Sequence, residues 1–352
     1  MDREITFAQA INEATDLCLA ADPAVYVVGL GAPDPKGIFG TTAGLQAKYG
    51  PNRVMDMPCA ENAMTGIAVG SALVGMRPVM THQRVDFALL ALEQIVNQAA
   101  NWYYMFGGQR SVPLVIRLII GRGWGQGAQH SQSLHAWFAH VPGLKVVMPT
   151  TPSDAKGLLI ASVEDNNPVI FLEHRWLHNI RGPVPEGLYR VPLGQARLAR
   201  EGANLTIAAT SYMTLEALRA AEALAACGVS AEVLDIRTIK PLDEAGLLAS
   251  VAKTGRLIVA DAGWQTDGFA GELIARVATQ AFGKLKSAPA RITLPDCPTP
   301  TAPALAHDYY PRAIHILTAA QEMLGLPATA AELLPESGLP LDVPDPSFTG
   351  PF

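Results

Sequence analysis

Short apolar runs alternate with helix-type patterns along the first half of the chain. Strand-like apolar runs occur at 25–28, 78–80, 112–120 and 169–172. Between them apolar positions recur at helical spacing, and the first such segment opens with a capping box at Thr6 and Gln9. The expected helices span 7–18, 62–74, 86–102 and 153–164. This alternation predicts a mainly parallel sheet that is covered by helices on both faces.

A second alternating set begins after a stretch rich in proline and glycine. We expect that stretch, 181–202, to be a linker. Beyond it the pattern predicts strands at 205–209, 231–236, 257–261 and 291–294, and helices at 214–226, 243–252, 271–282 and 313–324. The predicted fold is therefore α/β, with two doubly wound domains at 1–180 and 203–330. The final residues, 331–352, combine acids and prolines without a base and predict an extended tail.

The charge pattern narrows the classes of partner. Only 16% of the 352 residues are charged, whereas an average globular chain has about 25%. We therefore expect part of the surface to be buried in a subunit interface; the alternative is a monomer with a weakly charged surface. A net charge of −6 without a basic tract argues against nucleic acid as a partner. The longest apolar run, 66–76, is far shorter than the about 20 residues that a membrane helix needs.

The cysteines bear on the cellular compartment. All four are widely separated, and none shows the spacing of a metal-binding motif. Since the first residues also lack the pattern of a signal peptide, we expect reduced thiols and a cytoplasmic location.

Three motifs place glycine or polar residues where chemistry would need them. Glycines at 121, 123, 125 and 127 follow a predicted strand, which fits a phosphate cradle or a flexible active-site loop. We favour the loop, because no dinucleotide fingerprint or Walker A sequence occurs. His130 either shuttles protons or belongs to a helix-capping cluster with Ser131. Glu61, among apolar residues at a helix start, is either a surface residue stabilised by the helix dipole or, if buried, a proton-sharing carboxyl.

Longer stretches of the chain match one protein family when they are taken together. They are 49–54, 60–61, 75–79, 86–87, 93–100, 107–109, 129–132, 143–147, 154–158 and 165–173 in the first half, and 231–238 and 240–243 in the second. In this order they resemble the beta subunit of the thiamine-diphosphate-dependent 2-oxo acid dehydrogenases, the decarboxylating component of the pyruvate and branched-chain 2-oxo acid complexes. The resemblance covers about residues 4–325.

The resemblance implies a fold, a cofactor and a set of partners. The fold would be a pyrimidine-binding, transketolase-like domain followed by a transketolase C-terminal domain. Members bind thiamine diphosphate between chains and pair with an alpha subunit as an α2β2 heterotetramer. The alpha subunit holds the diphosphate and its magnesium through a Gly-Asp-Gly motif, which this chain does not contain. A lipoyl acyltransferase is a further partner in such complexes.

The resemblance also assigns roles to single residues. Glu61 would bond the far pyrimidine nitrogen and favour the imino tautomer that removes the thiazolium proton. Phe87 would stack on the pyrimidine, and His130 would contact the substrate carboxylate or donate a proton. Family members bind a structural potassium ion through backbone carbonyls, and the matching positions are Leu114, Ser162, Val163, Asp165 and Asn167.

Two departures from the family pattern concern the substrate. The acidic residue usual after the first strand is missing from Gly29-Leu30-Gly31-Ala32-Pro33. Arg84 replaces a usually apolar residue beside the pyrimidine pocket, and His82 is unusual at its position. An added cation at Arg84 would favour an acidic or phosphorylated substrate; the alternative is that Arg84 faces the partner subunit.

The sequence therefore predicts the beta subunit of an enzyme that decarboxylates a 2-oxo acid and transfers the acyl or aldehyde unit. One alternative is a split transketolase-like or acyloin-forming enzyme that transfers a two-carbon unit. Another is a non-catalytic scaffolding subunit, against which the joint presence of Glu61, Phe87 and His130 argues. The sequence does not name the 2-oxo acid or ketose substrate or the acyl acceptor.

Overall fold

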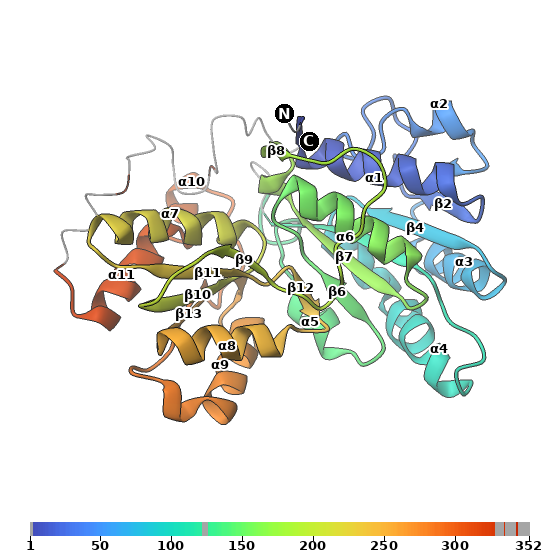
Figure 1. Ribbon diagram of the computed structural model, residues 1–352. Helices are drawn as coiled ribbons and strands as arrows, with labels where there is room; N and C mark the ends of the chain where they lie inside the picture. The colour runs from blue at the N-terminus through green and yellow to red at the C-terminus, as the bar shows by residue number, and fades with distance from the viewer. Residues whose placement is uncertain (1–2, 122–125, 328–333, 335–342, 344–352) are drawn as a thin grey trace.

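The computed structural model describes residues 3–121, 126–327, 334 and 343. Within these residues the chain forms two α/β lobes that lie side by side, each built on its own sheet (Figure 1). The predicted doubly wound α/β fold is confirmed. Residues 123 and 125 of the glycine motif, and most of the predicted tail, lie outside the described residues.

The first lobe is built on a seven-stranded sheet in the order β12-β6-β7-β5-β4-β2-β3. Neighbouring strands run parallel except β12 and β6, which are antiparallel. Every residue of the two central strands β5 and β7 is buried, which explains why apolar residues predominate in both; the buried exceptions are Arg117, Glu173 and His174. The strands span β2 Val25–Val28, β3 Val54–Met55, β4 Arg77–His82, β5 Val115–Ile120, β6 Lys145–Val147, β7 Val169–His174 and β12 Thr238–Lys240.

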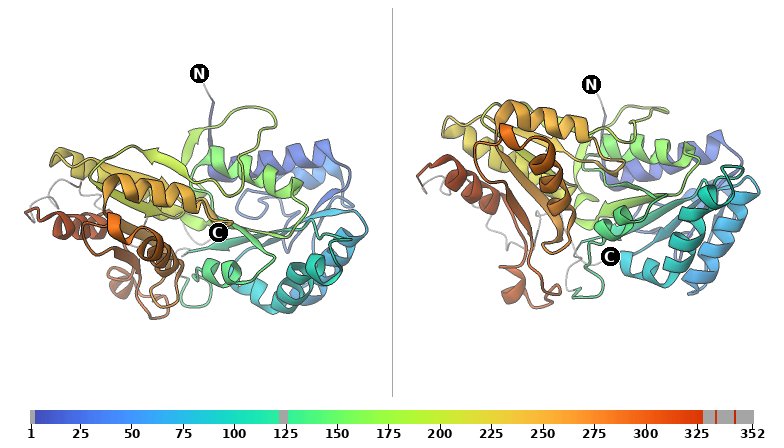
Figure 2. Two further views of the ribbon diagram at one scale, coloured as in Figure 1. Left: turned by 60° about the horizontal axis from the view of Figure 1, so that its bottom comes forward. Right: turned by 90° about the horizontal axis from the view of Figure 1, so that it is seen from below.

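Helices cover both faces of this sheet, as the turned views show (Figure 2). Helices α1 (Phe7–Ala21) and α6 (Pro152–Glu164) pack against each other on one face, and α1 begins at the expected capping box of Thr6 and Gln9. On the other face α3 (Glu61–Leu73) packs on a helical stretch that was predicted as one helix. That stretch is a 3₁₀ segment η1 (Val85–Ala91), a π-helical segment η2 (Glu93–Ala99) and helix α4 (Ala100–Met105).

The second lobe contains a five-stranded sheet in the order β14-β13-β10-β11-β9. Its strands span β9 Arg197–Arg200, β10 Leu205–Ala209, β11 Ala231–Asp235, β13 Leu257–Trp264 and β14 Ala290–Leu294. Helices α7 (Tyr212–Ala226) and α11 (Ala313–Leu324) pack together on one face. Helices α8 (Glu244–Thr254) and α9 (Phe269–Gln280) cover the other face. Shorter helical segments are α2 Leu45–Tyr49, α5 His135–His140, η3 Arg175–Leu177, η4 Phe282–Lys284 and α10 Pro303–Ala306.

The two lobes share strands and core, so the expected linker is partly ordered structure. Within it, β8 (Arg181–Pro183) pairs with β1 (Glu4–Thr6), and β9 joins the second sheet. Conversely, β12 follows β11 in the second half of the chain but pairs with β6 and extends the first sheet. One hydrophobic cluster runs continuously from the α3 face of the first lobe to α8 and α9. The lobes are therefore held as one packed unit at their junction.

A partly buried charge network also crosses the junction of the lobes. The Asp154 carboxylate at the start of α6 accepts a hydrogen bond from Arg237 Nη1 and lies 3.1 Å from Arg197 Nε. Arg197 in turn donates to Asp235 at 2.8 Å. Among the described residues no helix is long and apolar enough to cross a lipid bilayer.

Candidate active site

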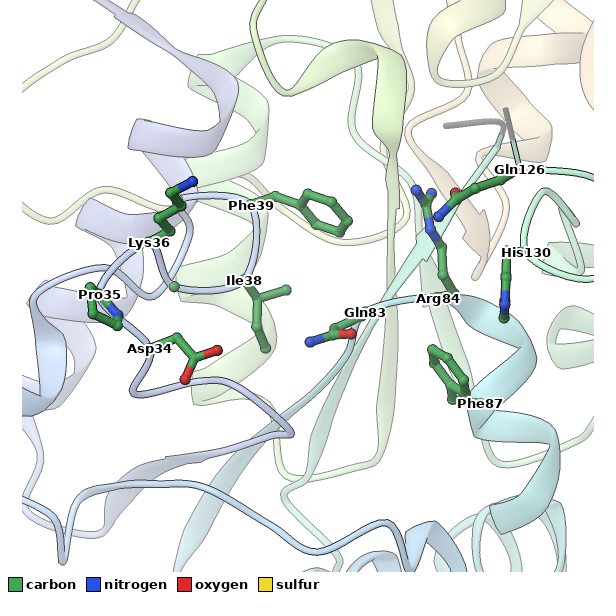
Figure 3. A pocket seen from close by; sticks show the side chains of 12 residues that line it. Asp34, Pro35, Lys36, Ile38, Phe39, Gln83, Arg84, Phe87, Gln126 and His130 are labelled. Atoms are coloured by element: carbon green, nitrogen blue, oxygen red, sulfur yellow. The ribbon is translucent and has the colours of Figure 1, made fainter. Parts of the chain in front are cut away.

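A cavity of about 730 Å³ opens where the central strands of the first sheet end. Strands β2, β4, β5 and β7 are parallel, so their carboxyl ends meet at one edge, where ligands bind in open α/β sheets. Figure 3 shows side chains from the loop after β2 facing those from η1 and from the segment before α5. We call this the edge cavity; it is lined by Asp34, Pro35, Lys36, Gly37, Ile38, Phe39, Gly40, Gln83, Arg84, Phe87, Gln126 and His130.

His130 and Asp86 form a hydrogen-bonded pair at the wall of the edge cavity. His130 Nδ1 lies 2.9 Å from Asp86 Oδ2; the Asp86 side chain is 3% exposed and the His130 side chain is 37% exposed. Burial raises the pKa of Asp86, and the contact with His130 partly offsets this. A carboxylate on Nδ1 fixes the orientation of the imidazole and leaves Nε2 for a ligand. The pair can therefore hold or move a proton in the cavity.

Phe87 lies beside this pair. Its ring centroid is 5.4 Å from that of His130, at an interplanar angle of 43°. Phe87 is the residue directly after Asp86 in η1, so one helical segment positions both the aromatic surface and the carboxylate. The cavity thus has a flat apolar wall next to a proton-carrying group.

Glu61 is buried at the start of α3 but does not line the edge cavity. It is 7% exposed, and no described residue gives its side chain a hydrogen bond. One helical turn further on, Thr65 Oγ1 contacts Met80 Sδ in β4 at 3.3 Å. Because residues four apart share a helix face, Glu61 faces the carboxyl end of β4, the same sheet edge as the cavity. Its position at a helix N-terminus stabilises the negative charge.

Arg84 faces the edge cavity and not solvent. It is 3% exposed and donates from Nη1 to the carbonyl of Gly121 at 3.2 Å. Its guanidinium carbon lies 5.3 Å from the ring centroid of Phe39, and that of Arg175 lies 4.8 Å from the same centroid. Two buried arginines therefore contact one aromatic ring. Burial lowers the pKa of Arg84 to about 10, and the nearby charge of Arg175 adds to this effect.

The altered loop after β2 contributes backbone contacts and a different acid. The amide of Gly31 donates to Asp56 Oδ1 at 2.9 Å, and Gln83 Nε2 donates to the carbonyl of Leu30 at 3.0 Å. The second of these bonds joins the loop to Gln83, the residue that precedes Arg84. Asp34 is the acidic side chain that this loop brings to the cavity wall.

The positions matched to a potassium site lie together at the far end of the sheet. The carbonyls of Val163 and Asp165 both accept hydrogen bonds from Arg77 Nη1 at 3.0 Å. The carbonyl of Leu114 accepts from the amide of Val169 at 2.9 Å, and that of Ser162 accepts from the amide of Asp165 at 3.3 Å. Asn167 donates its amide to Asp165 Oδ1 at 2.8 Å. A guanidinium already compensates two of these carbonyls, so potassium stays a prediction, and we derive no step from it.

Sequence reasoning missed Asp86, Phe39 and Arg175 as site residues. The expected helix began at Asp86, but the helical segment begins one residue earlier with Arg84 at its cap, and the Asp86 carboxylate is hydrogen-bonded to His130. Arg175 directly follows Glu173 and His174, the last two residues of the buried strand β7. Consecutive polar residues at the end of a fully buried strand were the signal that could have found it.

Two family models match the two lobes. "Transketolase, pyrimidine binding domain" matches residues 3–179, and "Transketolase, C-terminal domain" matches residues 194–316. A solved structure described as a split gene transketolase, an inactive beta4 tetramer, superimposes with a TM-score of 0.74 at 25% identity. That match covers 92% of this chain and 99% of the other.

Named relatives resemble the chain over nearly its whole length. The beta subunit of acetoin:2,6-dichlorophenolindophenol oxidoreductase from Cupriavidus necator is 43% identical over 334 residues, covering 92% of this chain and 98% of the relative. The protein of the same name from Bacillus subtilis is 39% identical, covering 93% and 99%. The pyruvate dehydrogenase E1 component subunit beta-2 from Oryza sativa is 41% identical, covering 91% of this chain and 86% of the relative.

Proposed function

The chain belongs to the beta subunits of the heteromeric thiamine-diphosphate-dependent 2-oxo acid dehydrogenases, and from that premise we propose how it works. It supplies the pyrimidine half of the active site of an enzyme that decarboxylates a 2-oxo acid and passes on the acyl or aldehyde unit. An alpha subunit in an α2β2 assembly supplies the diphosphate and magnesium half. The proposal includes a cytoplasmic location and, as acyl acceptor, a lipoyl acyltransferase.

The side chain of Glu61 is the observation that carries this proposal. Glu61 is 7% exposed, and no described residue gives its carboxylate a hydrogen bond. The carboxylate oxygens are not among the fully buried side-chain atoms that lack a partner, so they keep accessible surface and are open to a ligand. A pyrimidine nitrogen placed at the carboxyl end of β4 would supply that bond. The apolar ring of Phe87 at the same sheet edge fits the flat face of such a ring.

Three side chains of this chain have separate roles in cofactor binding and proton transfer. When bound, thiamine diphosphate would supply a carbon nucleophile for the substrate carbonyl. Glu61 would hold a proton at the pyrimidine nitrogen, and Phe87 would position the ring by stacking. His130, oriented by Asp86 through Nδ1, presents Nε2 to the substrate oxygen, where it donates or accepts a proton.

We assign the binding of the diphosphate and magnesium to the alpha subunit, because two features that such binding would need are not found in the sequence or the described residues of this chain. The described residues contain no group of three or more His, Cys, Asp or Glu side chains that could hold a metal ion. The sequence contains no Gly-Asp-Gly motif. A complete cofactor site therefore requires a second chain.

A second candidate is cleavage or formation of an acyloin in place of decarboxylation. Two of the relatives are named for acetoin, and their identity to this chain is similar to that of the pyruvate enzyme. Both reactions need the same proton transfers by Glu61 and His130, so the site alone accommodates either. Assays of the assembled enzyme with pyruvate and with acetoin, using an artificial electron acceptor, distinguish the two.

The proposal is tested by Glu61→Gln in the complex with its alpha subunit. Glutamine keeps the size of the side chain but cannot take up the proton, so kcat should fall about a hundredfold or more. Glu164→Gln is the matched control, because Glu164 is exposed and pairs with Arg190. A wild-type kcat in Glu61→Gln, with the complex assembled, would refute the assignment.

A further inference from the structure

The segment that carries His130 is buried on its carboxyl side. Ser131 and Leu134 are buried, and the segment leads into α5, whose first residue is the fully buried His135. The Ser131 hydroxyl donates to the carbonyl of Gln126 at 2.9 Å, which ties the two sides of His130 together. Because the backbone around His130 is packed in this way, the anchor at the end of the segment decides where the His130 side chain lies.

His135 is anchored to the second lobe by a buried carboxylate. Its Nε2 donates to Asp261 Oδ2 in β13 at 3.0 Å, and both side chains are fully buried. The other ring nitrogen, Nδ1, has no hydrogen-bond partner among the described residues. Thr210 Oγ1 donates to the second carboxylate oxygen of Asp261 at 2.5 Å. Burial would raise the pKa of Asp261, but these two donors and the Gly263 amide hold it below its ordinary value.

The packing around this pair fixes its geometry. A Cβ at Gly263 would lie 3.0 Å from both Asp261 Oδ2 and His135 Cε1, so a glycine there makes room for the pair. Phe269 at the start of α9 meets the His135 ring edge-on, with the centroids 6.4 Å apart at an interplanar angle of 81°. The ring of His135 therefore has a defined place in the second lobe.

The second lobe also touches the segment on the other side of His130. A Cβ at Gly127 would lie 2.1 Å from the hydroxyl oxygen of Thr301, which follows β14. The stretch 126–135 is thus held against the second lobe on both sides of His130. By contrast, every residue that lines the edge cavity belongs to the first lobe.

We propose that His135 and Asp261 are positioning residues for His130. By fixing the end of the segment to the second lobe, they hold His130 where its Nδ1 meets Asp86 and its Nε2 is left for a ligand. Neither residue lines the edge cavity, so both act through His130. The second lobe thereby takes part in the proton transfer. The inference rests on the proposed function, in which His130 donates or accepts a proton.

Substitution of His135 tests the positioning role. His135→Phe keeps a ring but removes the hydrogen bond to Asp261. In the assembled enzyme kcat should fall about ten- to a hundredfold, because a displacement of about 1 Å can cost that much, whereas the Kd of thiamine diphosphate should not change. His135→Gln, whose amide can still donate to Asp261, should restore much of kcat. Arg237→Met is the matched control, because it removes another hydrogen bond across the lobe junction, to Asp154, outside 126–135. Its kcat should stay close to that of the wild type.

Hydrogen–deuterium exchange of the assembled complex gives a readout that does not depend on turnover. The amides of 126–135 should exchange faster in His135→Phe than in the wild type, and at the wild-type rate in Arg237→Met. If His135→Phe does not assemble, Asp261→Asn takes its place. Asparagine keeps the shape of the side chain but not its charge, so it should change both readouts in the same direction by a smaller amount.

The two readouts separate this inference from the proposed function. Unchanged exchange of 126–135, or an equal loss of kcat in Arg237→Met, overturns the inference and leaves the proposed function standing. Faster exchange together with a wild-type kcat overturns the inference as well, because the held segment then does not serve catalysis. A wild-type complex without turnover on pyruvate or acetoin overturns the proposed function, while the exchange measurement still decides whether the pair holds the segment.

Discussion

Replacing Arg117 by methionine should destabilise the first lobe strongly. Arg117 in β5 and Glu173 in β7 are both fully buried, and their side chains form two hydrogen bonds of 2.6 and 3.0 Å. His178 Nε2 lies 3.3 Å from the same carboxylate. Burial alone would raise the pKa of Glu173, but Arg117 and His178 hold it at about 2, below its ordinary 4.5. The carboxylate is therefore charged in a dry site and depends on its partners.

The expected cost follows from what remains after the substitution. Removing one partner of a buried ion pair leaves an uncompensated charge and costs about 3–5 kcal/mol. Arg190→Met removes an exposed partner of Glu164 and should cost about 0–1 kcal/mol. Urea unfolding of the purified chain at pH 7 measures both. Equal unfolding midpoints for the two variants would refute the argument that Glu173 depends on Arg117.

The pH dependence of this effect has a definite sign. Because the pKa of Glu173 is lowered in the folded wild type, its contribution to stability is present above pH 4.5. That contribution is lost as the pH falls from about 4.5 towards about 2. In Arg117→Met the buried carboxylate of Glu173 becomes neutral when it takes up a proton at acidic pH. The difference in free energy of unfolding between wild type and variant should therefore shrink below pH 4.5, and a constant difference would contradict this account.

Two further substitutions test side chains near the carboxyl end of β4. Asp86→Asn keeps the size of the side chain but removes the charge that orients His130, so kcat of the assembled enzyme should fall about tenfold or more; an unchanged kcat would show that His130 does not need this carboxylate. Burial lowers the pKa of His82 to about 4, so the ring is neutral, and its Nε2 has no hydrogen-bond partner among the described residues. His82→Leu should raise the free energy of unfolding by about 1 kcal/mol, and a decrease would contradict an unpaired ring.

Local pattern predicted the regular elements of the fold well. Strands 25–28 and 205–209 and helix 313–324 have the same bounds in the structure, because apolar runs and helical periodicity are local signals. Strand β12 was not predicted, since three residues carry little pattern and its partner strand β6 belongs to the other lobe. The helix expected at 86–102 divides into 3₁₀, π and α segments whose hydrogen bonds leave no mark on periodicity.

Sequence motifs predicted single residues of the site but not the contacts between them. Glu61 and His130 were candidates from their local motifs and received roles from the resemblance, Phe87 came from the resemblance alone, and the structure brings Phe87 and His130 together. The pairing of His130 with Asp86 joins residues 44 positions apart, which no spacing rule connects. The direction of Arg84 also depends on tertiary contacts with Gly121 and Phe39. Side-chain directions at a sheet edge therefore needed the structure.

The most direct test of the central claim is whether this chain alone can bind the cofactor. In titration calorimetry with thiamine diphosphate and magnesium, the purified chain should show no micromolar binding, because it supplies only the pyrimidine half of the site. The same titration with the alpha subunit present should show tight binding, and Glu61→Gln should weaken it. Micromolar binding of the cofactor by this chain without a partner would contradict the two-subunit account.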